Sequence, residues 1–447
     1  MHSFCRRFFA LPFGSYNIYD YFCRKENRLW LCSRQSMLTK NKILSLLNYP
    51  EKTNTAIVDN KVVEIKVYGE ESIYNRMAMI SHYLHNTDLL TGDDREMAIR
   101  YMRDYISTIH PEYDEEYMSK VCENALQLDL FQDLFDVPFP APKNPRFTFI
   151  DLFAGIGGIR IPFSELDGKC VFSSEWDKAA QTTYTSNFGE IPFGDITKIK
   201  ADFIPRHDIL LAGFPCQAFS IMGKMKGFDD TRGTMFFEVA RILDYHHPKA
   251  ILLENVKQLV SHDGGKTFRV ILETLDKLGY HVKWKILNAL DFGLPQKRER
   301  VIIVGFMDKE AADRFNFDFE KIPYSLEGIL ESEEKIEGSL IASDEIQAKR
   351  QKRVEGKNVF YPSIWHENKS GNISVLPYAC ALRTGASYNY LLVNGYRRPS
   401  SRELLRLQGF PDNYNIVVSH TEIRKQTGNS VAVPMIRAVA NKIVELI

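Results

Sequence analysis

Short apolar runs alternate with amphipathic runs between residues 147 and 306. The apolar runs predict strands at Phe147–Phe153, Lys169–Ser174, Asp208–Leu211, Ala250–Leu253 and Val301–Phe306. Apolar positions with helical spacing between them predict helices at Ile159–Leu166, Lys178–Asn187, Thr234–His246 and Lys266–Leu278. Because nearly continuous apolar strands need cover on both sides, the pattern predicts an α/β domain with a parallel sheet between two layers of helices.

Different patterns lie before this region. Residues 37–136 place charged and apolar residues at helical spacing, which predicts a mostly helical N-terminal appendage. Prolines at positions 138, 140, 142 and 145 predict a linker over residues 137–146, because proline lacks an N–H donor and disfavours helix before it. The central domain is therefore expected over residues 147–307.

After residue 307 the alternation is lost, and an acidic run at 331–337 and a basic run at 349–353 accompany weak strands. We expect a separate small domain over residues 308–396. In the following segment, residues 397–447, Ser400 and Glu403 have capping-box spacing and predict a helix from Glu403 to Gln408. A last helix is expected from Val431 to Leu446.

The first 36 residues show no periodicity and hold three of the seven cysteines. Met37 then begins a helix-like run, Leu38–Leu47. We therefore expect Met37 to be the natural start and residues 1–36 to be a non-native or disordered extension. N-terminal mass spectrometry of the native protein tests this expectation.

Composition narrows the class of protein. The 447 residues include 57 basic and 57 acidic side chains, so the formal net charge is zero. Any surface that binds nucleic acid must therefore be a local basic patch, because the protein as a whole has no excess positive charge. The seven cysteines are scattered without metal spacing, which predicts a reducing compartment and no metal site. No run approaches the roughly 20 apolar residues that span a bilayer. We expect a soluble, cytoplasmic protein with no membrane partner.

A candidate nucleophile follows the apolar run Asp208–Ala212. Cys216 comes directly after Pro215, whose ring fixes the backbone ahead of the thiol. Cysteine is intrinsically very nucleophilic as its thiolate, so a strand-ending position suits covalent catalysis. A buried structural cysteine is the equally weighted alternative.

A glycine-rich turn follows the first predicted strand and carries Gly155, Gly157 and Gly158. In a parallel sheet this position binds nucleotide-like ligands, because glycine lets the ligand approach the backbone. Arg160 occupies the place of a third glycine, so the match to a dinucleotide site is incomplete. Glu175, at the end of the second strand, is placed to hold ribose hydroxyls, and Trp176 could stack on adenine. A simple turn, a helix-start carboxylate and a core tryptophan remain the alternatives.

Further polar residues lie at later strand ends. Glu254 follows an apolar strand, where burial would raise its pKa and make it a proton donor, although an exposed strand-end glutamate is the alternative. Alternation over residues 296–300 puts Gln296, Arg298 and Arg300 on one face. These donors suit an anion or a base edge, and a solvated edge strand is the alternative.

Five separated segments carry a family resemblance, together with Gly409–Pro411: Phe149–Gly158, Gly213–Gln217, Glu254–Val256, Gln296–Arg300 and Gln426–Val431. Their order resembles that of cytosine-C5 DNA methyltransferases, over about residues 146–306 and 396–447. The likeness is to bacterial restriction-modification enzymes and their solitary relatives. It implies a Rossmann-like mixed sheet with helices on both faces, a target-recognition domain over 308–396, and a C-terminal segment that returns to the catalytic domain.

The resemblance implies methyl transfer from S-adenosylmethionine to C5 of a cytosine flipped out of a specific double-stranded DNA sequence, with S-adenosylhomocysteine as product. Cytosine C5 is a poor nucleophile, so Cys216 would first add to C6. Glu254 would protonate or hydrogen-bond N3. Arg298 and Arg300 would hold the base or its flanking phosphate.

The resemblance also assigns binding residues. Nine positions would contact the cofactor: Phe153 and Trp176 the adenine, Gly155 and Gly157 the methionine, Glu175 the ribose, Asp195 and Ile196 the adenine edge, with Asn429 and Val431 closing the pocket. DNA contacts are expected at Ser220 and Lys224, in the loop after the nucleophile, and at Gln296, Arg383 and Thr384.

Three alternative functions remain open. An NAD-dependent oxidoreductase shares the glycine turn but leaves Cys216 and Glu254 without a purpose. An RNA cytosine-C5 methyltransferase shares the chemistry, and an idle DNA-binding regulator shares the DNA surface. We expect a monomer that protects host DNA, with a cognate restriction endonuclease as its genetic partner.

Overall fold

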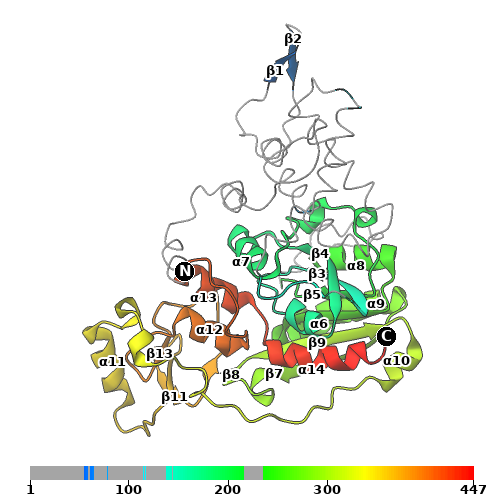
Figure 1. Cartoon of the computed structure of the whole chain (residues 1–447). Helices are drawn as coiled ribbons and strands as arrows, with labels where there is room; N and C mark the ends of the chain where they lie inside the picture. The colour runs from blue at the N-terminus through cyan, green and yellow to red at the C-terminus, as the bar shows by residue number, and fades with distance from the viewer. Residues whose placement is uncertain are drawn as a thin grey trace. The chain divides into compact units, whose positions relative to one another are not determined.

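The computed structural model describes residues 55–58, 61–64, 78, 114, 116, 137–142, 144–215 and 235–447 (Figure 1). The chain divides into two compact units, Met1–Asp136 and Val137–Ile447. In the first unit, β1 (Thr55–Val58) pairs antiparallel with β2 (Lys61–Glu64), which the helical pattern did not predict. The expectations for residues 1–36 and for the helical run at 38–47 lie outside the described residues.

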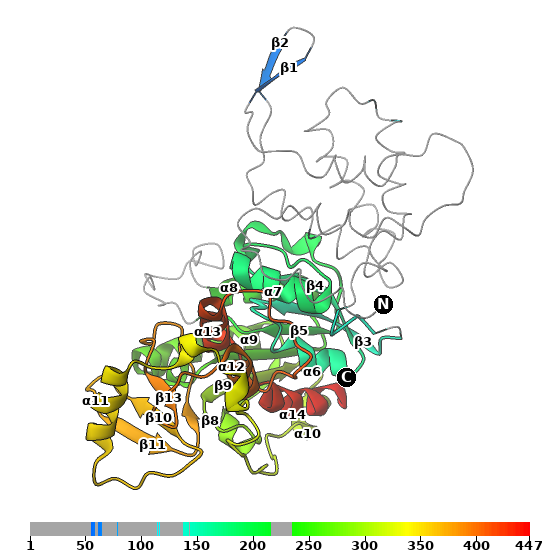
Figure 2. The same cartoon turned by 60° about the vertical axis from the view of Figure 1, so that its left-hand side comes forward.

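A six-stranded sheet in the order β4-β3-β5-β6-β9-β7 forms the centre of the second unit (Figures 1 and 2). Its strands are β3 (Phe147–Leu152), β4 (Gly168–Ser174), β5 (Ile209–Ala212), β6 (Ala250–Val256), β7 (His281–Asn288) and β9 (Glu299–Phe306). β3 pairs parallel with β4 and β5, and β5 pairs parallel with β6. β9 is antiparallel to both of its neighbours. The sheet is therefore mixed, as the resemblance implied, and not wholly parallel, as the pattern alone predicted.

The pattern missed β7, the edge strand beside β9. Its exposed and buried side chains do not alternate, because Trp284, Lys285 and Ile286 are exposed in succession. Nζ of Lys283 donates to the carbonyls of Asp313 and Phe315, so the following segment covers part of this edge. Charged residues on an edge strand break the apolar run on which a sequence-based prediction depends.

Helices cover both faces of the sheet. They are α6 (Arg160–Glu165), α7 (Lys178–Phe188), α8 (Met235–His246), α9 (Lys266–Lys277) and α14 (Val433–Val444), each within two residues of its predicted bounds. The β3-to-β4 and β5-to-β6 connections run in opposite directions along the sheet, so right-handed crossovers place α6 and α8 on opposite faces. α14 packs against α6, so the C-terminal segment belongs to the helical layer on that face of the six-stranded sheet.

A smaller region adjoins the sheet (Figure 2). β10 (Ile364–Glu367) pairs antiparallel with β11 (Ile373–Leu376) and β13 (Leu391–Val393), and β12 (Ala379–Cys380) pairs parallel with β8 (Gln296–Lys297). Trp365 is buried at the centre of its core, near α11 (Asp344–Val354). α10 (Lys309–Arg314) and the buried Phe315 belong instead to the core of the six-stranded sheet. Phe317 belongs to the same core and Phe319 packs against it, so in space the small region begins after residue 319.

α12 (Ser401–Gln408) begins with the predicted capping box. Oγ of Ser400 accepts from the backbone N–H of Glu403, and the Glu403 carboxylate accepts from the N–H of Ser400. The same carboxylate forms a bidentate pair with Arg397, at 2.8 and 2.9 Å, with both side chains fully buried. α13 (His420–Asn429) follows and ends at the segment that borders the glycine-rich turn. Across the described ranges, no helix is long and apolar enough to cross a bilayer.

Candidate active site

Glu254 and Arg300 form a nearly buried ion pair at the carboxyl end of β6. Nε of Arg300 lies 2.9 Å from Oε1 of Glu254, and the two side chains are 12% and 9% exposed. Burial raises the pKa of Glu254, while the charges of Arg300 and Arg298 oppose that rise. The register of β6 on β9 sets this pair, because Val256 lies opposite Arg300. The site thus holds a carboxyl group that stays protonated to higher pH than a free glutamate, beside a cation.

The segment that leads to Cys216 is fixed to the same strand end. Ala212, the last residue of β5, is in register with Leu253, so Gly213 lies beside Glu254. A Cβ atom on Gly213 would be 3.6 Å from Oε2 of Glu254. Nδ2 of Asn255 donates to the carbonyl of Phe214, at 2.8 Å in the interior. Cys216 itself, with Ser220 and Lys224, lies outside the residues whose side chains the structure describes.

Arg298 ties three parts of the chain together. Its Nη1 donates to the carbonyl of Leu382 at 3.3 Å, and its Nη2 donates to the carbonyls of Gly428 (3.1 Å) and Ser430. The side chain is 1% exposed, and burial, reinforced by Arg300, lowers its pKa to about 9. These contacts turn the guanidinium of Arg298 toward protein carbonyls rather than toward solvent, and Arg300 is the arginine that pairs with Glu254.

Gln296, which we predicted to contact DNA, lies in the interior of the protein. The side chain is fully buried, and its Nε2 donates to the carbonyl of Leu407 at 2.7 Å. Its Oε1 accepts from the backbone N–H of Leu382 at 3.1 Å. The alternation over residues 296–300 exists, because Lys297 is exposed between buried neighbours, but the shared face points into the protein. Gln296 therefore joins β8 to α12 and to residue 382.

The glycine-rich turn after β3 is unpacked at Gly155 and tightly packed at Gly157. Phe153, Gly155 and Gly157 have φ angles of +56°, +56° and +78°. A Cβ on Gly155 would meet no atom of the described residues within 4 Å, whereas a Cβ on Gly157 would lie 2.2 Å from the ring of Phe188. The turn needs glycine at residue 157 for packing, and at residue 155 the backbone faces free space that a ligand can enter.

Glu175 and Trp176 flank this turn. Oε2 of Glu175 accepts from the N–H of Gly155 and Oε1 from the N–H of Asp177, both at 2.8 Å. Burial raises the pKa of Glu175, and the backbone hydrogen bonds oppose the rise. Trp176 is 78% exposed, which excludes the core alternative and leaves a free indole surface beside the carboxylate. Backbone N–H groups of three residues use three of the roughly four lone-pair positions of this carboxylate, so a position remains for a further donor.

The remaining predicted cofactor residues lie on three separate elements. Asp195 caps the short helix Ile196–Lys198 by accepting from Thr197, and Ile196 is buried. A Cβ on Gly158 would lie 2.7 Å from Oγ of Ser430 and 3.0 Å from Val431, so the end of the chain's last motif lies against the glycine-rich turn. Asn429 is exposed, and its Oδ1 accepts from Oγ1 of Thr384 at 2.6 Å.

A buried charged cluster lies behind the turn, and the sequence carried only an indirect sign of it. Arg160 forms a bidentate pair with Glu190, at 2.7 and 3.0 Å, and donates to the hydroxyl of Tyr184. Asp151 on β3 is fully buried, and neither carboxyl oxygen has a hydrogen-bond partner among the described residues. Burial raises its pKa to about 7, with Arg160 opposing. The sign was the mismatch at Arg160, which replaces the third glycine of a dinucleotide site.

Comparison with known proteins decides the family. The family described as C-5 cytosine-specific DNA methylase matches residues 147–445. The chain belongs to this family. The methylase is 58% identical over 303 residues to the type II methyltransferase M.HaeII of Haemophilus aegyptius, covering 67% of this chain and 93% of that protein. It is 57% identical over 293 residues to the type II methyltransferase M.NgoBI of Neisseria gonorrhoeae, covering 65% and 91%.

Solved structures support the fold. The methylase resembles the Dnmt2 methyltransferase of S. pombe, with a TM-score of 0.51 and 18% identity over 67% of this chain and 99% of that one. It also resembles the Entamoeba histolytica methyltransferase EhMeth, with a TM-score of 0.52 and 16% identity over 68% and 99%. At these identities the likeness concerns architecture alone.

The methylase is thus a DNA (cytosine-5-)-methyltransferase, which confirms the predicted family, fold class and activity. The family implies S-adenosylmethionine as methyl donor. The residues present fit such a ligand, because the free space in front of Gly155 is bordered by a carboxylate and an exposed indole. The NAD alternative is set aside by the family assignment.

Proposed function

We propose that the methylase acts on a cytosine flipped out of double-stranded DNA, through a temporary covalent bond between Cys216 and C6. The observation that carries this proposal is the Glu254–Arg300 pair at the strand end beside Gly213. Cys216 follows Gly213 by three residues, and Asn255 holds the intervening carbonyl of Phe214. A nucleophile and a proton donor are thereby supplied from adjacent parallel strands.

In the proposed reaction, the Cys216 thiolate adds to C6 while protonated Glu254 gives its proton to N3. Electrons of the ring are thereby moved to C5, which becomes nucleophilic. S-adenosylmethionine supplies an electrophilic methyl group. Loss of the C5 proton to a base then lets the C6–S bond break, which returns the electron pair to Cys216 and the N3 proton to Glu254. All atoms are accounted for by methyl transfer and release of one proton.

Arg300 and the backbone around it support this sequence of steps. Its Nε fixes the Glu254 carboxyl group, and the raised pKa of Glu254 favours the protonated form that addition at C6 requires. Arg298 holds residues 382, 428 and 430 around the same strand end. The target base must leave the stack to reach these groups, because C6 is not accessible to a side chain within a duplex.

For the cofactor, we propose that Glu175 binds the ribose hydroxyls, that Phe153 and Trp176 contact adenine, and that the glycine-rich turn borders the methionine part. Asp195, Ile196, Asn429 and Val431 complete the proposed set. Support comes from the exposed Trp176 ring, the spare lone-pair position of Glu175 and the open space at Gly155. Calorimetric titration with S-adenosylhomocysteine, compared between the wild type and Glu175→Gln, tests this set: equal affinities would contradict the role of Glu175.

Bisulfite sequencing of plasmid from cells that express the methylase tests the reaction. We expect methylated cytosines at one short sequence with the wild-type protein and none with Cys216→Ala. Glu254→Gln keeps the side-chain size and should lower turnover by about 10²- to 10⁴-fold, the usual contribution of a positioned acid or base. Methylation that survives in Cys216→Ala would overturn the covalent step. Methylation of transfer RNA but not of plasmid would favour the RNA alternative.

The type II relatives support a second part of the proposal, namely that a cognate endonuclease cuts the same sequence. Plasmid methylated by this protein should resist an endonuclease encoded beside it, whereas unmethylated plasmid is cut. We further propose that the methylase works as a monomer, which light scattering of the purified protein checks.

A further inference from the structure

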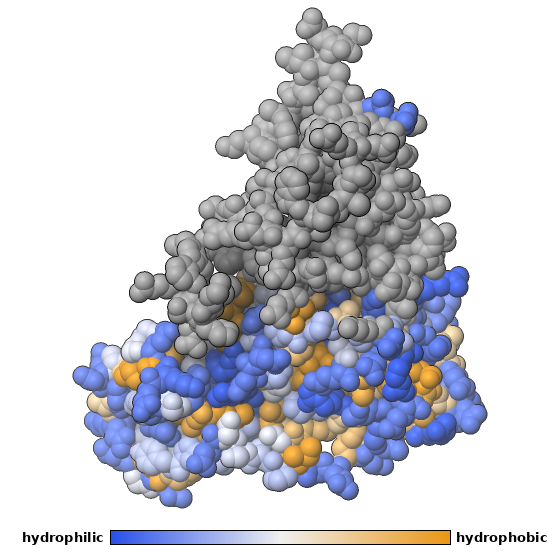
Figure 3. All heavy atoms as spheres, in the orientation of Figure 1, coloured by the Kyte–Doolittle hydropathy of each residue, from blue (hydrophilic) through white to orange (hydrophobic). Residues whose placement is uncertain are grey.

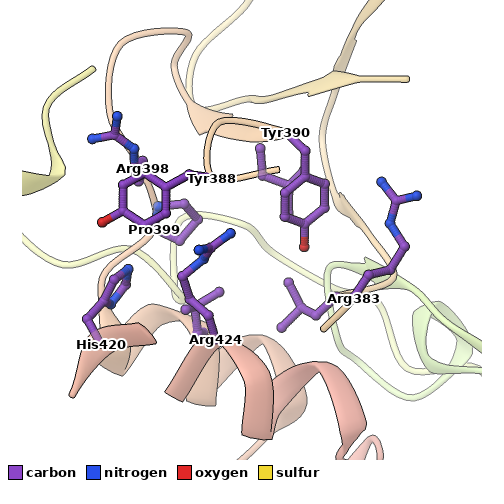
Figure 4. A pocket seen from close by; sticks show the side chains of 10 residues that line it. Arg383, Tyr388, Tyr390, Arg398, Pro399, His420 and Arg424 are labelled. Atoms are coloured by element: carbon purple, nitrogen blue, oxygen red, sulfur yellow. The ribbon is translucent and has the colours of Figure 1, made fainter. Parts of the chain in front are cut away.

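A pocket rich in arginine and tyrosine lies where the small region meets α13 (Figure 4). We call it the basic pocket; its charged and aromatic members are Arg383, Tyr388, Tyr390, Arg398, His420 and Arg424. Arg424 rises from α13 toward the ring of Tyr388, and the tyrosines come from the segment before β13. Hydropathy alone does not distinguish the basic pocket from its surroundings, because hydrophilic residues cover most of the described surface in the view of Figure 3.

Three guanidinium groups gather here without an ion-pair partner in the part of the chain that the structure describes. The guanidinium carbons of Arg398 and Arg424 lie 4.3 and 4.5 Å from the centre of the Tyr388 ring, and that of Arg383 lies 5.1 Å from the centre of the Tyr390 ring. Tyrosine faces attract these cations but do not neutralise them. The basic pocket therefore keeps an uncompensated positive charge.

The guanidinium groups of Arg398 and Arg424 contact protein groups before any ligand arrives. Arg398 is 9% exposed and donates to Oδ1 of Asn389 and to the carbonyls of Ser339 and Ile341, at 2.8 to 3.2 Å. Its Nη2 has no hydrogen-bond partner within the described ranges. Arg424 uses only its Nη2, in a 3.3 Å bond to the carbonyl of Ser387. Fixed forks of free N–H groups bind phosphate at a low entropic cost.

His420 contributes a polar ring nitrogen to the basic pocket but no charge in its neutral form. Its Nδ1 pairs with Oγ of Ser401 at 2.9 Å, while its Nε2 is buried and has no partner among the residues that the structure describes. Burial, together with Arg424 and Arg398, lowers the pKa of His420, and Glu337 opposes them. The neutral ring leaves the arginines as the charged lining of the basic pocket.

The position of the basic pocket links it to the reacting centre. Arg383 lies between Leu382, whose carbonyl accepts from Arg298, and Thr384, whose hydroxyl donates to Asn429. Arg298 is two residues from Arg300, the partner of Glu254. One wall of the basic pocket is thus anchored to the chain segment that carries Arg298 and Arg300, and the other wall belongs to α13.

We propose that the basic pocket binds a phosphate of the DNA backbone next to the flipped cytosine. This inference rests on the proposed function, since the ligand is the double-stranded substrate. Arginine forks match phosphate oxygens, whereas the Tyr388 ring, already in contact with two guanidinium groups, is poorly placed to stack on a base. Arg383 and Arg424 therefore fix the register of the enzyme on DNA and do not read its sequence.

Salt dependence of DNA binding tests this proposal. Affinity for a duplex of mixed sequence is measured at several salt concentrations for the wild type, Arg383→Gln and Arg424→Gln. Each substitution should weaken binding about 3- to 10-fold near 0.1 M salt and reduce the slope of log affinity against log salt by about 1. Arg314→Gln, on α10, removes the same charge from an exposed position on another helix and should leave the slope unchanged.

Three results would overturn the proposal. One is an unchanged slope in both variants. Another is a changed set of methylated sequences in the bisulfite map with unchanged affinity for mixed-sequence DNA, since that pattern marks base reading. Inorganic phosphate at constant ionic strength is the remaining arm: stabilisation that Arg424→Gln abolishes, without any change in the DNA slope, would assign the basic pocket to a free anion and also overturn the proposal.

The proposed function is tested separately. Loss of methyl transfer in Cys216→Ala concerns the covalent step and leaves the salt slope as it is. Arg383→Gln and Arg424→Gln should raise the KM for DNA while kcat at saturating DNA is retained, so failure of one idea is distinguishable from failure of the other.

Discussion

Arg300 holds its Nε 2.9 Å from Oε1 of Glu254 although water reaches little of either side chain. After burial, Arg300 is the largest influence on the pKa of Glu254, and it lowers that pKa. The arginine thus restrains how far burial can push the carboxyl group toward its protonated form. One side chain on β9 tunes the acidity of another on β6.

Arg300→Gln should move the alkaline limb of the pH–rate profile to higher pH. Removing the cation leaves burial less opposed, so the pKa of Glu254 rises and the protonated form persists further into alkaline solution. Turnover at the optimum should fall because the carboxyl group loses the contact that orients it. A profile measured at saturating DNA checks this; a limb that stays in place or moves to lower pH contradicts it.

Gly155 and Gly157 of the glycine-rich turn should respond differently to substitution by alanine. Gly157→Ala places a methyl group 2.2 Å from the Phe188 ring, in a backbone with φ of +78°, so it should lower the free energy of unfolding by more than about 2 kcal/mol. The methyl group of Gly155→Ala meets no atom of the described residues within 4 Å, so this variant should lose about 1 kcal/mol through its φ of +56°.

The affinity for S-adenosylhomocysteine provides a second test of Gly155→Ala. The methyl group of Gly155→Ala would stand in the open space in front of the turn, so affinity should fall although the fold is retained. Urea denaturation and calorimetric titration measure the two quantities. Wild-type affinity in Gly155→Ala would show that the ligand does not approach this position.

Asp151 should make the protein less stable as the pH rises. Burial raises its pKa from the usual 3.8 to about 7 in the folded protein, so the folded state binds the proton more tightly than the unfolded chain. This contribution is fully present below pH 3.8 and is lost progressively up to about pH 7, a change on the order of a few kcal/mol. Asp151→Asn should flatten the dependence of the unfolding free energy over this range; an equally steep dependence in the variant would contradict the assignment.

The Arg397–Glu403 pair should be costly to break from one side. Both side chains are fully buried, so Glu403→Gln leaves the guanidinium with only the largely exposed carboxylate of Glu333, 3.1 Å from its Nε, as a countercharge. We expect a loss of about 3–5 kcal/mol in the free energy of unfolding, against about 1 kcal/mol for Ser400→Ala, which removes only the cap. Denaturant titrations of the two variants give the comparison. Similar small losses in both would mean that the pair contributes little.

The local hydrophobic pattern was sufficient to predict strands that are apolar in sequence and buried in the structure. The strands Phe147–Leu152 and Ala250–Val256 are buried on both faces, and their apolar runs predicted them. β7 has one exposed edge with Lys283 and Lys285, so its pattern resembled a charged surface. The direction of β9 was not predictable either, because an antiparallel strand buried between two neighbours has the same apolar run as a parallel one.

The candidate site shows the same division. Adjacent strand ends brought Glu254 beside the segment of Cys216, as the order of motifs implied, and Glu175 contacts the turn at Gly155. Alternation placed Gln296 and Arg298 on one face but could not say that the face points inward. The basic pocket was partly visible in Arg383, while Arg398 and Arg424 join it only through the packing of distant segments.

The contacts of Arg298 also bear on the order in which the methylase is made. Two of its three carbonyl partners, at Gly428 and Ser430, are synthesised 130 and 132 residues after the arginine itself. A nascent chain that has already completed every strand of the six-stranded sheet therefore still lacks the contacts that hold its catalytic strand end. A fragment that ends before residue 428 lacks both of these carbonyl acceptors, so its Arg298 side chain cannot be held as it is in the full chain.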